Sequence, residues 1–123
     1  MQKSIVLYTI LIVFTLIIGS ATAKAQNIFL DFTLINKTGI DIYELYISAS
    51  DAEYWEDNIL GSVVLEDNTY VDIEFSPYAV SAFWDIMIVD YEGTSVIFEE
   101  LNLTDILELT LYIDGLRVWA EWE

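Results

Sequence analysis

The chain has 123 residues and an extreme charge, because 21 acidic residues stand against 4 basic ones, with no His and no Cys. The absence of Cys and His excludes a cysteine nucleophile, a Ser-His-Asp triad, a disulfide framework and a zinc site built from these ligands. The net charge of −17 disfavours nucleic acid and anionic lipid as partners and favours a cation or a basic protein, although an acidic surface can also serve only to keep a chain in solution.

The first 25 residues differ in composition from the rest. Lys3 precedes an uncharged apolar run over residues 4–18, and small residues follow up to Ala25. This order predicts a secretory signal peptide, cleaved before Gln26 or, as a second candidate, before Lys24. The alternative is an uncleaved anchor, for which the run is short because a membrane span needs about 20 residues. We therefore expect export to the periplasm or the medium, no stable membrane insertion after cleavage, and a single domain over residues 26–123.

After the leader, apolar and polar residues alternate, which indicates β-strands. The expected strands, in chain order, are 28–35, 42–48, 62–65, 70–75, 83–90, 95–99, 106–113 and 116–121. The turn residues 36–39 predict a hairpin between the first two strands, and Asp114-Gly115 predicts another between the last two. Residues 50–58 are expected to form a loop with a short helical turn that begins at Ser50. The pattern as a whole predicts a compact antiparallel β-sandwich of about eight short strands, in preference to a closed barrel.

The alternation also predicts which side chains face the core. They are Ile28, Leu30, Phe32, Leu34, Val71, Ile73, Phe75, Trp84, Ile86, Ile88, Leu107, Leu109, Leu111 and Ile113. Such a core suits one monomeric domain that folds without disulfides.

An acidic loop at residues 50–58 is the best candidate for a ligand site. Its acidic members are Asp51, Glu53, Glu56 and Asp57. Hard cations such as calcium bind several carboxylate oxygens, so the loop predicts a weak calcium site, although the spacing does not match an EF-hand. The competing interpretation is a solvated acidic loop held in place by Tyr54 and Trp55. A second, weaker cluster consists of Asp85, Asp90 and Glu92.

Aromatic side chains provide a second candidate, a binding surface for a partner or a glycan. Its expected members are Tyr54, Trp55, Trp119 and Trp122. Trp and Tyr are frequent in such surfaces because a large apolar ring carries one polar group. We expect Trp119 and Trp122 to lie on one side of the last strand. The competing interpretation has Trp119 capping the core and Trp122 covering a sheet edge.

Several short motifs, taken together, resemble those of a known group of proteins. The segments 34–39, 42–48, 55–61, 84–86 and 90–93 resemble the series N-x-TG, IYELY-S, W-x4-LG and WD-x-x-V-x-D-x-x-G, with Ile88 at the Val position of the last motif. This series is similar to that of small exported bacterial proteins with one β domain of unknown function. Some members of that group carry an argininosuccinate lyase label, which implies a much larger helical enzyme. The resemblance implies a small β domain and adds no catalytic residue.

Three functions are compatible with these observations. The first is an exported, non-catalytic binding module of the cell envelope, whose partner is a basic protein or a cation. The second is a calcium-stabilised structural domain. The third and weakest is a small carbohydrate-active enzyme, since two carboxylates across a cleft can hydrolyse glycosides but a domain of this size has little room for a deep cleft.

Overall fold

The computed structural model describes residues 29–123, so the expected leader and its cleavage sites lie outside the described residues. Residues 29–123 form seven strands and contain no helix, and therefore none that would span a membrane. The strands are β2 (Phe32–Lys37), β3 (Glu44–Ala49), β4 (Tyr70–Ile73), β5 (Phe83–Val89), β6 (Ser95–Asn102), β7 (Glu108–Asp114) and β8 (Arg117–Trp122).

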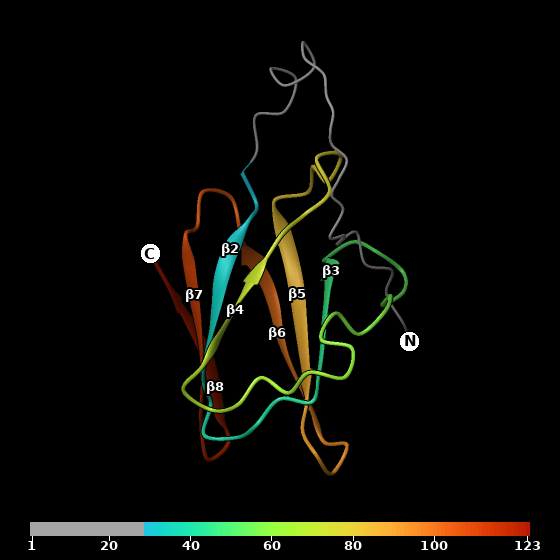
Figure 1. The fold of residues 1–123 in the computed structure, drawn as a ribbon. Coiled ribbons are helices and arrows are strands. Elements are labelled where there is room, and N and C mark those ends of the chain that lie inside the picture. The colour runs from blue at the N-terminus through green and yellow to red at the C-terminus, as the bar shows by residue number, and fades with distance from the viewer. Residues whose placement is uncertain (1–28) are drawn as a thin grey trace.

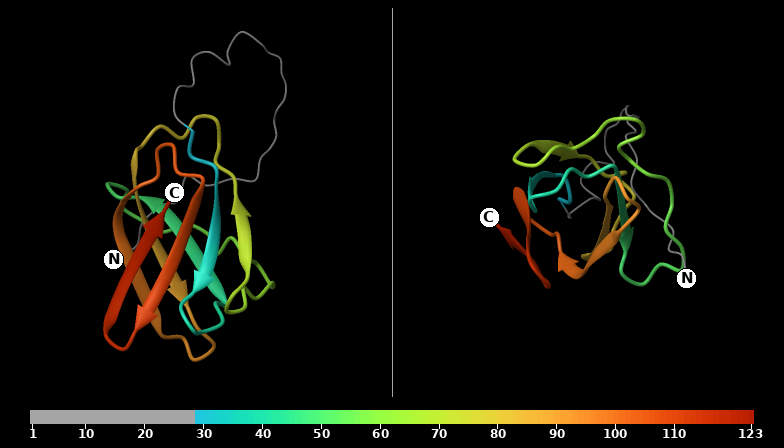
Figure 2. Two further views of the ribbon diagram at one scale, coloured as in Figure 1. Left: turned by 90° about the vertical axis from the view of Figure 1, so that its left-hand side faces the viewer. Right: turned by 90° about the horizontal axis from the view of Figure 1, so that it is seen from below.

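The strands form two sheets that face each other (Figures 1 and 2). One sheet has four strands in the order β4-β2-β7-β8, and the other has three in the order β3-β5-β6. All neighbouring strands are antiparallel except β2 and β7, which pair in parallel. The predicted β-sandwich is therefore confirmed, with one parallel pair that the sequence pattern did not predict.

The core lies between the sheets and is made by the side chains that alternate inward from each strand. Leu34, Leu45, Ile47, Trp84, Ile86, Ile88, Leu109 and Leu111 are each 0% exposed. The prediction for Leu107 was wrong, because this residue lies before β7 and is 74% exposed. Burying a large aliphatic or aromatic side chain contributes about 1.5–3 kcal/mol, so this alternation is the main source of stability.

The predicted hairpin between residues 28–35 and 42–48 was wrong, because β2 and β3 belong to different sheets. Asn36 turns the chain from one sheet to the other, and its side chain is completely buried. Its amide nitrogen donates to the carbonyl oxygens of Ile40 (2.9 Å) and Leu65 (3.0 Å), and its Oδ1 accepts from Thr38 N (3.0 Å) and Thr38 Oγ1 (2.6 Å). Buried polar groups require such partners, so the turn residues stabilise a crossover instead of a hairpin.

The predicted strand at 62–65 is reduced to one antiparallel bridge between Ile42 and Leu65. The expected helical turn at Ser50 is also absent from the described residues. The chain forms one hydrogen-bonded turn at this position, in which Ala52 N donates to Ala49 O (3.0 Å), and no helix follows it. The predicted hairpin at Asp114-Gly115 is confirmed, although the two turn residues are Gly115 and Leu116, because Asp114 pairs with Arg117.

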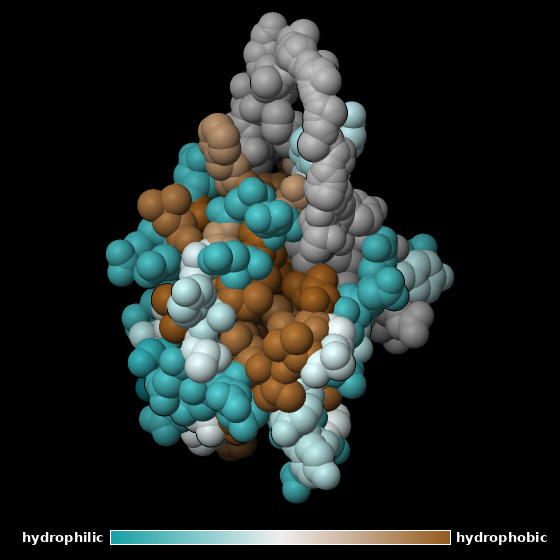
Figure 3. All heavy atoms as spheres, in the orientation of Figure 1, coloured by the Kyte–Doolittle hydropathy of each residue, from teal (hydrophilic) through white to brown (hydrophobic). Residues whose placement is uncertain are grey.

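The segment after β3 covers the outer edge of that strand. Ile59 N donates to Leu45 O (2.9 Å), and Leu45 N donates to Asn58 Oδ1 (2.9 Å). An uncovered edge would offer unpaired backbone groups to other chains, so this segment protects the sheet. Apolar side chains still reach the surface on the face shown in Figure 3. Val71 of β4 and Ile59 are only partly buried and pack against the core.

Candidate functional site

The four acidic residues of the loop 50–58 do not form a common site. Asp51, Glu53, Glu56 and Asp57 are all exposed. Within residues 29–123, no group of three or more acidic side chains lies close enough together to hold a metal ion. Calcium binding by this loop stays a prediction, which the melting temperature in millimolar calcium would test.

The aromatic residues of the same loop differ from each other. Tyr54 is 51% exposed, whereas Trp55 is half-buried and packs edge-on against Tyr46, with ring centroids 6.3 Å apart. Tyr46 donates a hydrogen bond of 2.6 Å to Glu44 Oε1. This hydrogen bond, then burial, and then the negative charges of Glu44 and Asp57 raise the pKa of Tyr46 to about 12. Because its ring packs against Tyr46 of β3, Trp55 holds the loop against that strand.

The weaker acidic cluster is not gathered at one place. Asp90 closes the turn between β5 and β6, where its Oδ1 accepts the backbone N–H groups of Glu92 and Thr94, both at 2.9 Å. Asp85 lies near the other end of β5 and is 2% exposed. The separation of these two carboxylates explains why the cluster makes no common ligand set.

The expectation that Trp119 and Trp122 share one side of the last strand was wrong. Residues three apart in a strand point to opposite faces. Trp122 lies across from the core residue Leu109, whereas Trp119 lies across from Tyr112 on the outer face. The rings of Trp119 and Tyr112 stack at 5.1 Å, and the Arg117 guanidinium lies 4.4 Å from the Trp119 ring centroid. These contacts occupy the indole, so Trp119 neither caps the core nor offers a free stacking surface.

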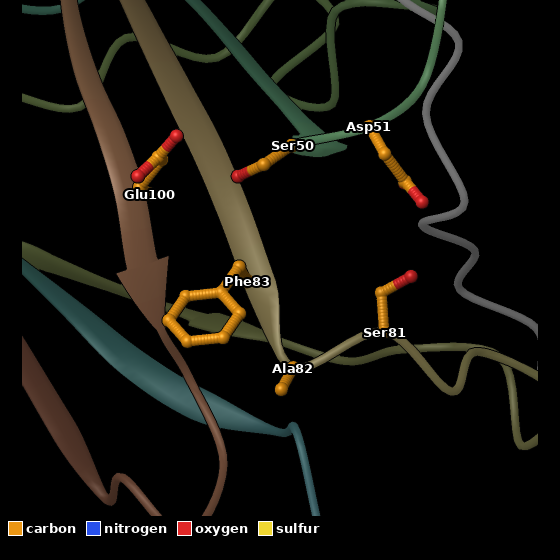
Figure 4. A pocket seen from close by; sticks show the side chains of 6 residues that line it. All are labelled: Ser50, Asp51, Ser81, Ala82, Phe83 and Glu100. Atoms are coloured by element: carbon orange, nitrogen blue, oxygen red, sulfur yellow. The ribbon is translucent and has the colours of Figure 1, made fainter.

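A pocket of about 490 Å³ opens beside the start of β5 (Figure 4). It is lined by Ser50, Asp51, Ser81, Ala82, Phe83 and Glu100. In Figure 4 the side chains of Asp51 and Ser81 point toward one another across the hollow, and the Phe83 ring lies beside it. Phe83 is 52% exposed, whereas the residue after it, Trp84, is 0% exposed. The pocket therefore combines two carboxylates and two hydroxyls with an accessible aromatic ring.

A β-bulge shapes this pocket. Trp84 pairs with Leu101 and Ile86 pairs with Phe98, so Asp85 alone faces both Glu99 and Glu100. Buried Asp85 accepts hydrogen bonds on Oδ1 from Ser50 Oγ (2.7 Å) and Glu100 N (2.9 Å). Asp85 thus fixes two of the pocket residues. Bulges of this kind often re-aim a side chain at a functional site.

A second, smaller hollow of about 310 Å³ lies at the far end of β5. Its lining residues are Ile40, Asp41, Tyr43, Asp90, Tyr91 and Glu92. The rings of Tyr43 and Tyr91 contact each other at 5.4 Å, and Tyr91 is 80% exposed. The two hollows therefore share the same chemistry, carboxylates beside an exposed aromatic ring.

Positive charge is confined to one face of the domain. In residues 29–123 the side-chain charge is 2 − 21 = −19, and no Lys or Arg occurs between Lys37 and Arg117. Lys37 of β2 pairs with Tyr112, and Tyr112 pairs with Trp119, so both cations lie with this aromatic pair on the outer face of the four-stranded sheet. The three-stranded sheet, its loops and both hollows therefore contain only acidic charges.

These features define a small all-β sandwich in which the described residues of one half include no cation and line two hollows with carboxylates and aromatic rings. No family model, no curated protein and no solved structure matches the chain.

Of the pocket residues, only Asp51 was among the predicted site residues. Phe83, Ser81 and Glu100 were missed because they are distant from the loop 50–58 in sequence and are joined to it only by strand pairing. A usable signal was the pair Glu99-Glu100, since two successive acidic residues break the alternation of a strand and can mark a bulge.

Proposed function

We propose that this chain is an exported, non-catalytic binding module that recognises a basic protein. The observation that carries the proposal is that, among residues 29–123, no cation belongs to the half of the sandwich that contains β3, β5 and β6. Complementary charge steers partners together and suppresses binding of partners with the same sign. Exposed aromatic rings beside carboxylates add a surface on which a cation can stack.

The motif series supports a place for the chain among the small exported β-domain proteins that it resembles. Asn36 donates a hydrogen bond to Leu65 O at the crossover between the sheets, and Asn58 accepts one from Leu45 N at the edge of β3. Trp84 fills the core and Asp85 organises the bulge. Motifs that stabilise a fold, with none that performs chemistry, suit a binding domain.

Binding of short charged peptides tests this function directly. We expect labelled hexa-arginine and hexa-lysine to bind the purified chain at low salt, and hexa-glutamate not to bind. The affinity should fall as salt rises, because exposed charges are screened over about 10 Å at 0.1 M salt. Fluorescence anisotropy measures both effects, and failure of both basic peptides to bind at low salt would overturn the proposal.

Export is tested separately by the N-terminus of the protein recovered from the envelope or the medium. We expect mass spectrometry to find a chain that begins at Gln26. A chain that retains residue 1 would support the anchor and reject cleavage.

A further inference from the structure

We propose that the pocket at the start of β5 receives an arginine side chain of the basic partner. This inference rests on the proposed function and names the site and the chemical group that the site recognises. The occupant is a guanidinium group, with the remainder of the partner lying on the acidic surface around it.

The composition of the pocket wall suits a guanidinium group. Asp51 and Glu100 supply carboxylates, and Ser50 and Ser81 supply hydroxyl oxygens that accept hydrogen bonds. A guanidinium has five N–H donors in a planar fork and no acceptor, so a wall of acceptors suits it. A neutral or anionic ligand would leave these carboxylates without a counter-charge.

The exposed ring of Phe83 also favours a guanidinium group. Phe83 begins β5 at a position that faces away from the core, and it keeps 52% of its surface exposed. A guanidinium stacks on such a ring through its planar face while its edges donate to carboxylates. An ammonium group forms the charge contacts but lacks the planar face, so the pocket should prefer arginine to lysine.

Hydrogen bonds hold the pocket in shape before a ligand binds. Asp85 is 2% exposed and accepts hydrogen bonds from Ser50 Oγ and Glu100 N, while Ser50 N donates to Phe83 O at 2.9 Å. These bonds join the residue that follows β3 to β5 and β6 beside the pocket. A pocket fixed before binding loses less conformational freedom when it is occupied, which favours affinity.

The test compares two double variants that remove the same charge. Asp51→Asn with Glu100→Gln removes the carboxylates of the pocket. Glu66→Gln with Glu74→Gln removes two exposed carboxylates elsewhere. We expect the pocket pair to weaken hexa-arginine binding about tenfold or more, because the guanidinium loses its charged hydrogen-bond acceptors. The control pair should weaken binding about threefold or less. Circular dichroism confirms that each variant is folded.

A single substitution tests the aromatic contact. Phe83→Ala should weaken hexa-arginine binding more than hexa-lysine binding, and Tyr70→Ala, which removes another exposed ring, should affect both peptides equally.

The outcomes separate the two proposals. Equal losses from both double variants, or no difference between the peptides with Phe83→Ala, would reject the pocket but leave the binding module intact. Binding of hexa-lysine without hexa-arginine by the unmodified chain would reject the pocket alone, and failure of both peptides to bind would reject both proposals.

Discussion

At the scale of single residues, Glu100 adopts a left-handed backbone conformation inside β6, with a φ of 55°. This conformation costs a non-glycine residue about 1 kcal/mol or more, whereas glycine adopts it freely. We expect Glu100→Gly to raise the free energy of unfolding by about 1 kcal/mol. Glu99→Gly removes the same charge at a position without positive φ and should lower the free energy of unfolding by about 0.5–1 kcal/mol. Urea denaturation measures both changes, and equal effects of the two substitutions would show that charge, and not backbone strain, dominates.

Tyr46 makes the stability of the domain depend on pH in the alkaline range. Its pKa in the folded chain is about 12, against an ordinary value of 10.0. Between these values the unfolded chain releases the phenol proton and the folded chain keeps it, so the free energy of unfolding falls as pH rises from 10 to 12. The contribution is fully present below pH 10. In the Tyr46→Phe variant, we expect the free energy of unfolding, measured by urea denaturation, to fall less steeply over this pH range. A slope identical to that of the unmodified chain would contradict the assignment.

The sequence predicts inward and outward residues well because alternation depends only on the local geometry of a strand. Leu30, Phe32 and Leu34 are buried as predicted. Trp119 and Trp122 lie on opposite faces of β8, contrary to the prediction, because side chains three residues apart in a strand point in opposite directions. The pocket was missed because strand pairing brings Glu100 beside Ser50, and no local pattern encodes that pairing.

At the scale of elements, the edge of β3 depends on one side chain. Asn58 Oδ1 accepts from Leu45 N at 2.9 Å and from Leu60 N at 3.0 Å, and its amide nitrogen donates to Gly61 O at 3.2 Å. We expect Asn58→Ala to lower the free energy of unfolding by about 2–3 kcal/mol, because two backbone donors lose their partner.

Asn102→Ala is the matched control, because Asn102 is exposed and its Oδ1 accepts only from Thr104 N, at 3.0 Å. This control substitution should lower the free energy of unfolding by about 1 kcal/mol or less. Light scattering after partial denaturation should show more aggregation for Asn58→Ala, whose β3 edge is less well covered. Equal stability losses in the two variants would refute a special role for Asn58.

Which strands pair is the part of the fold that local patterns did not determine. Residues 36–39 look like a hairpin turn, yet the buried amide of Asn36 makes them a crossover between sheets. The parallel pairing of β2 with β7 joins segments that are far apart in the chain. Turn composition predicts where a strand ends, but the partner of that strand depends on burial over the whole domain.

At the scale of the whole molecule, like-charge repulsion opposes folding. The described residues carry a side-chain charge of −19, and the cations are confined to one face. Salt shortens the range of this repulsion from about 30 Å at 0.01 M to about 3 Å at 1 M. We expect the melting temperature to rise by several degrees over this range with sodium chloride, measured by circular dichroism. A melting temperature that falls as salt is added would show that repulsion does not limit stability.

The central claim is that the half of the sandwich without cations, and not the face that holds Lys37 and Arg117, binds a basic partner. Nuclear magnetic resonance of the ¹⁵N-labelled chain during titration with hexa-arginine tests it residue by residue. We predict that the largest amide shift changes occur around Ser50, Asp51, Phe83 and Glu100, the residues that line the pocket. The largest changes on β2, β7 and β8, or no changes at all, would contradict the claim.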